Sequence, residues 1–328
     1  MRGRIWIVVN CAMLAAVLFG AFSYMNRYMS PRTMTVWYVP KSLDSTVEFW
    51  VAAQQGAAAA AEEYGVRIVV KGTTTESDSE GQIAILHEAL VEKPDAVILA
   101  ATDQQLLLPA AGELKDAGIK LVTVDSGLVG GQSASFIGTD NYAAGEQAGV
   151  MMAKAISGEG RIGIINTVRG SEAAWDRERG VRNTLQGYPQ VSVLASSYSG
   201  SLRERAYEIA RELLQTEPEL SGIVALNEPS AVGAAQAIAE LEGDRQVKLI
   251  GFDSSRDEVI FLEKGVLQAT VVQRPFNMGY LAVKTAVDVV QGRKVDKVID
   301  TGSVVITKQN MYFQEHQKLL FPFVGDGP

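Results

Sequence analysis

Short apolar runs that favour β-strands alternate with amphipathic segments of helical period along most of the chain. Strands that are apolar throughout are typical of a parallel sheet covered by helices on both faces, and the regular alternation favours an α/β fold. The predicted strands are 34–39, 66–71, 96–100, 120–125, 135–138, 161–166, 191–195, 222–226, 248–252, 268–272 and 303–306. The predicted helices are 48–64, 77–92, 106–117, 143–157, 172–185, 202–215, 230–241 and 276–291.

The chain is long enough for two domains. It has 328 residues, and a domain takes roughly 100–200 residues. The alternation breaks at 133–141, where a strand runs into the next helix, and again at Gln273-Arg274-Pro275. We predict that the chain crosses between two lobes at these points.

Residues 5–24 contain no charged side chain and are mostly apolar, with two arginines before the run and two after it. Roughly 20 apolar residues are enough to cross a bilayer as a helix, and basic residues before the run favour a cytoplasmic N-terminus. The run is therefore predicted to be an uncleaved signal anchor, or a signal peptide cleaved near the weak small-x-small match Ala21-Phe22-Ser23. A buried core helix is the alternative. With an anchor or a signal peptide, the chain after residue 33 is expected to be extracytoplasmic, at the cell membrane or in the periplasm.

The composition excludes several classes of protein. With 38 acidic and 30 basic side chains the net charge is −8, which counts against a general nucleic-acid binder. One cysteine rules out an intramolecular disulfide framework and a thiolate-rich zinc site, and two histidines leave little for His-based catalysis or metal ligation. The segment 158–163 formally matches G-x-G-x-x-G, but it precedes a strand, so a loop that ends a helix is the better interpretation. The sequence predicts no enzyme, no cofactor and no metal site.

Polar and aromatic residues follow several predicted strands, at the edge where ligands bind in open α/β sheets. These candidate binding residues are Lys41, Phe49, Trp50, Asp125, Arg177, Asn227, Asp253 and Gln273.

The chain resembles a known family in segments that keep a specific order and spacing. They are VPKSLDSTVEFWVAAQQGAAAAAEEYG, LVTVDSG, GTDNYAAGEQAG, WDRERGVRN, ALNEPSAVGAAQA, IGFDSS and VVQRPFNMGYLAVKTAVD. From about residue 33 to 308 the chain is similar to type I periplasmic sugar-binding proteins of ABC importers, the ribose, galactose and arabinose binders.

This resemblance implies two Rossmann-like lobes, each a parallel sheet between helices, joined by three crossing strands and closing over a ligand by a hinge motion. One lobe would comprise 33–139 and 274–302, and the other 140–273 and 303–328. Residues 1–32 would be the N-terminal transmembrane or signal helix with its linker.

The resemblance also assigns roles to the candidate binding residues. Phe49 and Trp50 match the aromatic pair that contacts the C–H face of a sugar ring, with lobe core as the alternative for both. Arg177 offers a planar fork that can donate to two oxygens. A carboxylate and two amides match the remaining polar ligands of sugar hydroxyls; they are Asp253, Asn227 and Gln273. The alternative for Asp253 is a turn or helix cap after the strand, and the alternative for Asn227 and Gln273 is a structural role.

Two positions bear on which sugar is bound. Asp125 matches the acid that ends the fourth strand, but its usual neighbour in ribose binders is arginine, whereas here it is Ser126. Lys41 follows Val-Pro, as in the lysine-bearing first loop of arabinose binders, which indicates a pentose such as arabinose; an exposed lysine is the alternative. The third aromatic of ribose binders has no counterpart in Ser199-Gly200-Ser201, so we expect a differently built pocket on that side.

Two uses of such a protein stay open at this point. It could present a monosaccharide, a pentose or a hexose, to the permease of an ABC importer. It could instead stay anchored in the membrane and signal sugar occupancy to a two-component histidine kinase. A repressor of the same fold would begin with a DNA-binding helix-turn-helix, where this chain has its apolar run, so no nucleic-acid partner is expected.

Overall fold

A computed structural model describes residues 32–241 and 246–320, together with Met13 and Phe19. Residues 35–328 form one compact unit, separate from residues 1–34. The predicted N-terminal helix at 5–24 lies outside the described residues except for Met13 and Phe19. In the part of the chain that is described, no helix is both long enough and apolar enough to cross a membrane.

The first sheet has six parallel strands in the order β12-β5-β4-β3-β1-β2. Its strands are β1 (Thr35–Val39), β2 (Arg67–Val70), β3 (Ala96–Leu99), β4 (Lys120–Val124), β5 (Phe136–Gly138) and β12 (Val298–Asp300). β3 is fully buried along its length, as the apolar run at this position predicts. We call this sheet with its helices the first lobe.

The second sheet has the order β13-β11-β10-β9-β6-β7, with β8 also paired to β6. Its strands are β6 (Glu159–Asn166), β7 (Gln190–Val193), β8 (Ser197–Tyr198), β9 (Leu220–Ala225), β10 (Lys248–Phe252), β11 (Leu267–Val272) and β13 (Val304–Thr307). Only β13 runs antiparallel to its neighbour among these described strands. This sheet with its helices is the second lobe.

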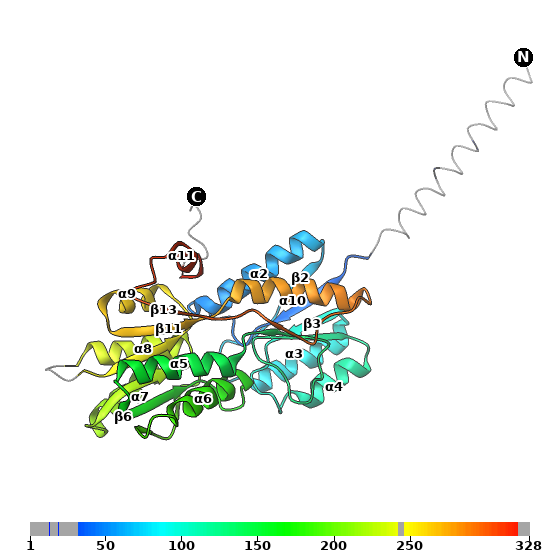
Figure 1. Ribbon diagram of the computed structural model, residues 1–328. Coiled ribbons are helices and arrows are strands. Elements are labelled where there is room, and N and C mark those ends of the chain that lie inside the picture. The colour runs from blue at the N-terminus through cyan, green and yellow to red at the C-terminus, as the bar shows by residue number, and fades with distance from the viewer. Residues whose placement is uncertain (1–12, 14–18, 20–31, 242–245, 321–328) are drawn as a thin grey trace, which may run out of the picture. The chain divides into compact units, whose positions relative to one another are not determined.

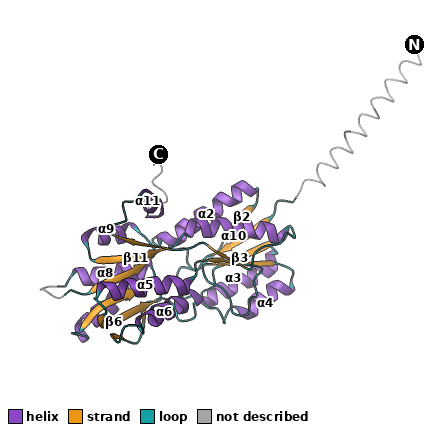
Figure 2. Ribbon diagram, viewed as in Figure 1, coloured by secondary structure: helices purple, strands orange, loops and turns teal. Residues whose placement is uncertain are grey.

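Helices cover both faces of the two sheets (Figures 1 and 2). Those of the first lobe are α2 (Glu48–Tyr64), α3 (Ser79–Glu92), α4 (Leu108–Asp116) and α10 (Pro275–Val290). Those of the second lobe are α5 (Asn141–Ala155), α6 (Glu172–Leu185), α7 (Arg203–Thr216), α8 (Glu228–Ala239), α9 (Arg256–Lys264) and α11 (Gln314–Leu320). The predicted α/β architecture of two lobes with parallel sheets is therefore confirmed.

The chain passes between the sheets three times. It leaves the first sheet after β5, returns after β11, and leaves again between β12 and β13. The first two passages fall at the breaks in the alternation, and the third follows the short edge strand β12.

Four elements were missed by the sequence patterns: β8, β12, α9 and α11. β8 is two residues long, and β12 is a three-residue edge strand with both ends exposed, so neither carries an apolar run. α9 and α11 have only nine and seven residues, too few for a clear helical period. The segment 158–163 does not precede a strand as predicted: residues 159–163 form the first part of β6, and the glycines do not open a helix.

Glycines allow the helices that carry candidate binding residues to pack closely on their neighbours. α2 and α10 lie side by side (Figure 1), and a Cβ atom at Gly56 would stand 1.9 Å from the carbonyl oxygen of Phe276. A Cβ at Gly279 would stand 1.9 Å from that of Ala53, on the other side of the same contact. The second lobe repeats this at Gly145 of α5, where a Cβ would lie 2.2 Å from the carbonyl oxygen of Arg177. These contacts fix α2 against α10 and α6 against α5.

We expect Gly56→Ala to lower the free energy of unfolding by about 1–3 kcal/mol, because the added methyl group pushes α2 away from α10. The matched control is Gly112→Ala in α4, where a Cβ meets nothing within 4 Å. That change should raise stability by about 0.5–1 kcal/mol through the better helix propensity of alanine. Chemical denaturation of the three proteins measures both effects. Equal stability of the two variants would contradict the close helix contact.

Candidate functional site

A small cavity lies between the lobes at the carboxyl ends of the strands, with a volume of about 30 Å³. It is lined by all eight residues that the sequence singled out, which come from both lobes: Lys41, Phe49, Trp50, Asp125, Arg177, Asn227, Asp253 and Gln273. Ligand pockets for small molecules usually measure about 300–1,000 Å³. The lobes are thus closed on one another, and the site must open or rearrange to admit a ligand of that size.

Lys41 is buried and paired, which excludes the exposed lysine that the sequence left open. Its ammonium lies 2.8 Å from an Asp125 carboxylate oxygen and donates to the Ser126 hydroxyl at 2.6 Å. It also donates to the hydroxyl of Ser171, in the second lobe, at 3.2 Å. The positive charge beside Asp125 therefore comes from Lys41, in the loop after β1. Ser126, the chain neighbour of Asp125, accepts a hydrogen bond from the Lys41 ammonium.

Asp253 and Gln273 form the corresponding polar wall of the second lobe. Gln273 donates an amide N–H to Asp253 at 2.6 Å, and the backbone N–H of Glu228 donates to the other carboxylate oxygen at 3.1 Å. Burial raises the pKa of Asp253, while the Arg177 charge opposes the shift. The Gln273 carbonyl oxygen is buried and has no hydrogen-bond partner in the described structure, which leaves an acceptor free for a ligand.

Arg177 and Asn227 are held by the protein itself. The Arg177 guanidinium donates to the Asn141 side chain at 2.9 Å and to the Leu226 carbonyl at 2.8 Å, so part of its fork is already used. Asn227 is the N-cap of α8: its side-chain oxygen accepts from the backbone of Ser230 at 3.1 Å. Asn227 thus has a structural role as a helix cap, and it also lines the cavity.

Phe49 and Trp50 lie in the first turn of α2 and are 7% and 2% exposed. Their rings meet edge to face with centroids 4.9 Å apart. Both border the cavity as well as being buried, so the binding and core interpretations are compatible at these positions.

Backbone strain concentrates in the cleft. Five non-glycine residues of the described chain have positive φ, and three of them lie at the cleft: Asp125 at 62°, Ser201 at 61° and Asp253 at 75°. Each costs energy that the surrounding structure must supply, which is a common feature of binding sites. The two aspartates end equivalent strands, β4 in one lobe and β10 in the other.

Carboxylates join the lobes by accepting backbone N–H groups from the opposite side. Glu228 at the start of α8 accepts from Glu48 and Phe49 at the start of α2, both at 3.2 Å. The Glu48 side chain in turn accepts from Arg256 at the start of α9, at 3.1 Å. Glu172 of α6 accepts from Gly127 at 2.5 Å. These bonds use the unpaired donors of helix N-termini and a loop.

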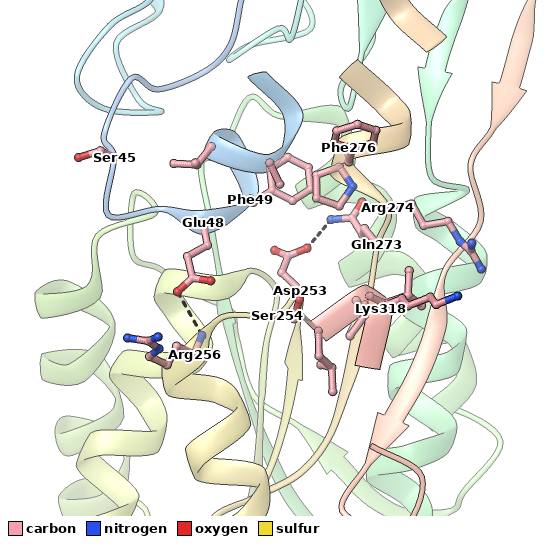
Figure 3. A pocket seen from close by; sticks show the side chains of 16 residues that line it. Ser45, Glu48, Phe49, Asp253, Ser254, Arg256, Gln273, Arg274, Phe276 and Lys318 are labelled. Carbon is pink, nitrogen blue, oxygen red and sulfur yellow. Dashed lines mark hydrogen bonds between the residues drawn. The ribbon is translucent and has the colours of Figure 1, made fainter. Parts of the chain in front are cut away.

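A second cavity of about 540 Å³ lies on the hinge side of the cleft. Figure 3 shows its walls, with Asp253 and Gln273 bonded on one side and Glu48 bonded to the backbone of Arg256 on another. Phe276 and residues 318–320 of α11 complete it. Phe49, Asp253 and Gln273 line both cavities and separate them.

Four polar residues of the cavity were missed by the sequence reasoning: Glu76, Thr167, Ser171 and Glu228. Glu76 lies in the loop after β2 and Ser171 in the loop after β6, while Glu228 follows Asn227 directly. Thr167 directly follows β6, so the rule that ligands bind at the carboxyl ends of strands could have found all four.

Residues 36–294 match the model of the periplasmic binding protein domain family. The chain belongs to this family. Membership in it indicates an extracytoplasmic location.

Most of the chain is similar to binding proteins whose names or solved structures include a sugar. The ribose import binding protein of Bacillus subtilis (strain 168) is 26% identical over 76% of this chain and 80% of its own length. A carbohydrate transporter solute binding protein from Agrobacterium radiobacter, solved with D-arabinose, is 33% identical with a TM-score of 0.84, over 89% of this chain and all of its own. An ABC transporter solute binding protein from Agrobacterium vitis, solved with D-fucose, is 33% identical with a TM-score of 0.84, and the match covers 87% of this chain and 99% of that one.

These relatives are binding proteins and not enzymes, as the sequence predicted for this chain. Among the residues that the structure describes, no group of three or more His, Cys, Asp or Glu side chains is placed to hold a metal ion. The site consists of hydrogen-bonding groups and aromatic rings.

Because Glu228 is buried between the lobes, we expect the free energy of unfolding to depend on pH through this residue. Burial raises its pKa from 4.5 to about 8, against the opposing effect of the Phe49 N–H bond. The folded protein then holds a proton that the unfolded chain releases above about pH 4.5. The free energy of unfolding should therefore fall, relative to Glu228→Gln, as the pH rises from 4.5 to 8, by on the order of 3–5 kcal/mol.

Denaturation of both proteins at several pH values measures this difference, with Glu62→Gln on the exposed face of α2 as the control. Glu62→Gln should follow the wild type at every pH. A constant gap between Glu228→Gln and the wild type would show that Glu228 is not buried between the lobes.

Proposed function

We propose that this protein binds a monosaccharide, a pentose or a hexose, between its lobes and delivers it unchanged to an ABC importer. The observation that carries the proposal is the cavity between the lobes, where two aromatic rings adjoin donors and acceptors from both sheets. Hydroxyl groups both donate and accept, so they suit a wall that mixes amides, carboxylates and cations. The ring faces suit the C–H face of a sugar.

The charges of the cavity favour a neutral ligand. Lys41 and Arg177 are the cations that line it, and three acids besides the protonated Glu228 line it with them: Glu76, Asp125 and Asp253. Lys41 is already paired with Asp125. A sugar acid or sugar phosphate would add negative charge to a buried site that already has an excess of it.

A pentose such as arabinose is the ligand that we favour. Lys41 of the first loop, which suggested this sugar, is buried at the cavity and paired with Asp125. The relative solved with D-arabinose supports the same choice. The relative solved with D-fucose keeps six-carbon sugars in the set to be tested.

We further assign the lobes to residues 33–139 with 274–302, and 140–273 with 303–328. The three passages of the chain between the sheets support these boundaries. A hinge at these passages would let the lobes separate and admit the sugar.

Trp50→Ala and Asp253→Ala should each weaken sugar binding at least tenfold, about 1.4 kcal/mol, since they remove a ring wall and a buried acceptor. Calorimetry with D-arabinose, D-ribose, D-fucose and further pentoses and hexoses measures the affinities. Trp175→Ala is the control, because Trp175 is 55% exposed and lies outside the cavity.

The proposal fails if the wild type binds no sugar, or if all three variants bind like the wild type. A sugar that is recovered chemically altered after incubation would contradict a pure binding function.

Uptake of the bound sugar tests the importer role. A host strain that lacks this chain should lose high-affinity uptake of the sugar and regain it with the intact gene. Unchanged uptake together with a lost transcriptional response to the sugar would support instead a sensor that signals to a histidine kinase. The relative named for ribose import favours the first outcome.

A further inference from the structure

Glu76 spans the cleft. It lies in the loop after β2 of the first lobe and borders the cavity. One of its carboxylate oxygens accepts the indole N–H of Trp50 at 2.6 Å, and the other accepts the hydroxyl of Ser201, in the second lobe, at 2.7 Å. A single acid therefore joins the aromatic wall of one lobe to a buried hydroxyl of the other.

Ser201 is held so that its hydroxyl proton points to Glu76. The hydroxyl oxygen accepts an N–H from the side chain of Asn227 at 3.0 Å, so its own hydrogen is left to donate. The backbone N–H of Ser201 donates to the hydroxyl of Ser199 at 3.1 Å. These bonds hold Ser201 at a φ of 61°, a conformation that few non-glycine residues adopt. Strain maintained in this way at a cleft indicates a selected position.

Counting lone pairs shows what Glu76 can still do. A carboxylate offers about four acceptor sites, and two are used by Trp50 and Ser201. The indole N–H has no acceptor capacity, and the Asn227 side chain is bonded to Ser201 and Ser230. On this wall Glu76 supplies spare acceptors, and a ligand group facing it must donate a hydrogen bond.

We propose that Glu76 determines sugar specificity by accepting a hydrogen bond from one ring hydroxyl of the bound sugar, beside the edge of Trp50. The inference rests on the proposed sugar-binding function. Glu76 is half-buried at the cavity and keeps its bonds to Trp50 and Ser201, so a sugar without a hydroxyl at that position forfeits one hydrogen bond to the carboxylate and binds more weakly.

The test uses the sugar that the wild type binds most tightly in the panel, together with its set of monodeoxy derivatives. The derivative that lacks the hydroxyl meeting Glu76 should bind the wild type at least tenfold more weakly than the parent sugar does, and it is identified as the one derivative whose loss of affinity depends on Glu76. In Glu76→Gln, the ratio of the Kd of that derivative to the Kd of the parent sugar should be at least fivefold smaller than in the wild type, since the charged acceptor is gone. Such non-additivity is what a direct contact produces.

Three further variants sharpen the result. Glu80→Gln, an exposed acid at the start of α3, should give the wild-type pattern. Ser201→Ala keeps the Glu76 carboxylate bonded to Trp50, so it should keep the discrimination even if overall affinity falls. Glu76→Asp serves if Glu76→Gln unfolds at a much lower temperature: the shorter acid should also reduce the discrimination.

The outcomes separate the two proposals. If the wild type binds no sugar, both the function and the role of Glu76 are wrong. If the wild type binds sugar but Glu76→Gln and Glu76→Asp leave every affinity unchanged, or lower all of them by one common factor, only the role of Glu76 is wrong.

Discussion

Carboxylates that reach from one lobe to the backbone of the other are the contacts on which the closed cleft depends. Glu228 accepts two N–H groups at the start of α2, and Glu48 in α2 accepts one at the start of α9. The first of these contacts positions the helix that carries Phe49 and Trp50 against the second lobe. Because Glu228 is almost fully buried, its pKa is high and its protonation is linked to closure. Closing the cleft and shaping its aromatic wall are thus one physical event.

The rest of the site follows from the cost of burying charge. A buried ammonium or carboxylate is tolerated only when it is paired or hydrogen-bonded, and Lys41 with Asp125 meets this condition. Asp253 depends on Gln273 and on the backbone of Glu228. These bonds fix the orientation of each polar group before a ligand arrives, so little ordering remains to be done on binding. The unpartnered oxygen of Gln273 and the spare acceptors of Glu76 are among the groups that remain for a ligand, together with the carboxylates of Asp125 and Asp253 and the guanidinium of Arg177.

The fold could be predicted because apolar strands and amphipathic helices are local patterns, which can be recognised in a single sequence. The sequence also brought together Asp125, Arg177 and Asp253, since the strand-end rule and the family resemblance point to the same edge. It missed Glu76 in the loop after β2, although the strand-end rule also applies to that loop, and it did not show that Asn227 caps α8. The cross-lobe bonds of Glu228 and Ser201 join residues more than 100 positions apart, and no local pattern reports such pairs.

A crystal structure of the protein with its tightest-binding sugar tests the central claim most directly. The account predicts the sugar ring between the lobes against Trp50, with its hydroxyls bonded to Asp125, Arg177 and Asp253. It also predicts that the cavity widens beyond its present volume of about 30 Å³ while Glu228 still bonds the start of α2. A sugar seated in the hinge-side cavity, or on the outer face of either lobe, would contradict the account.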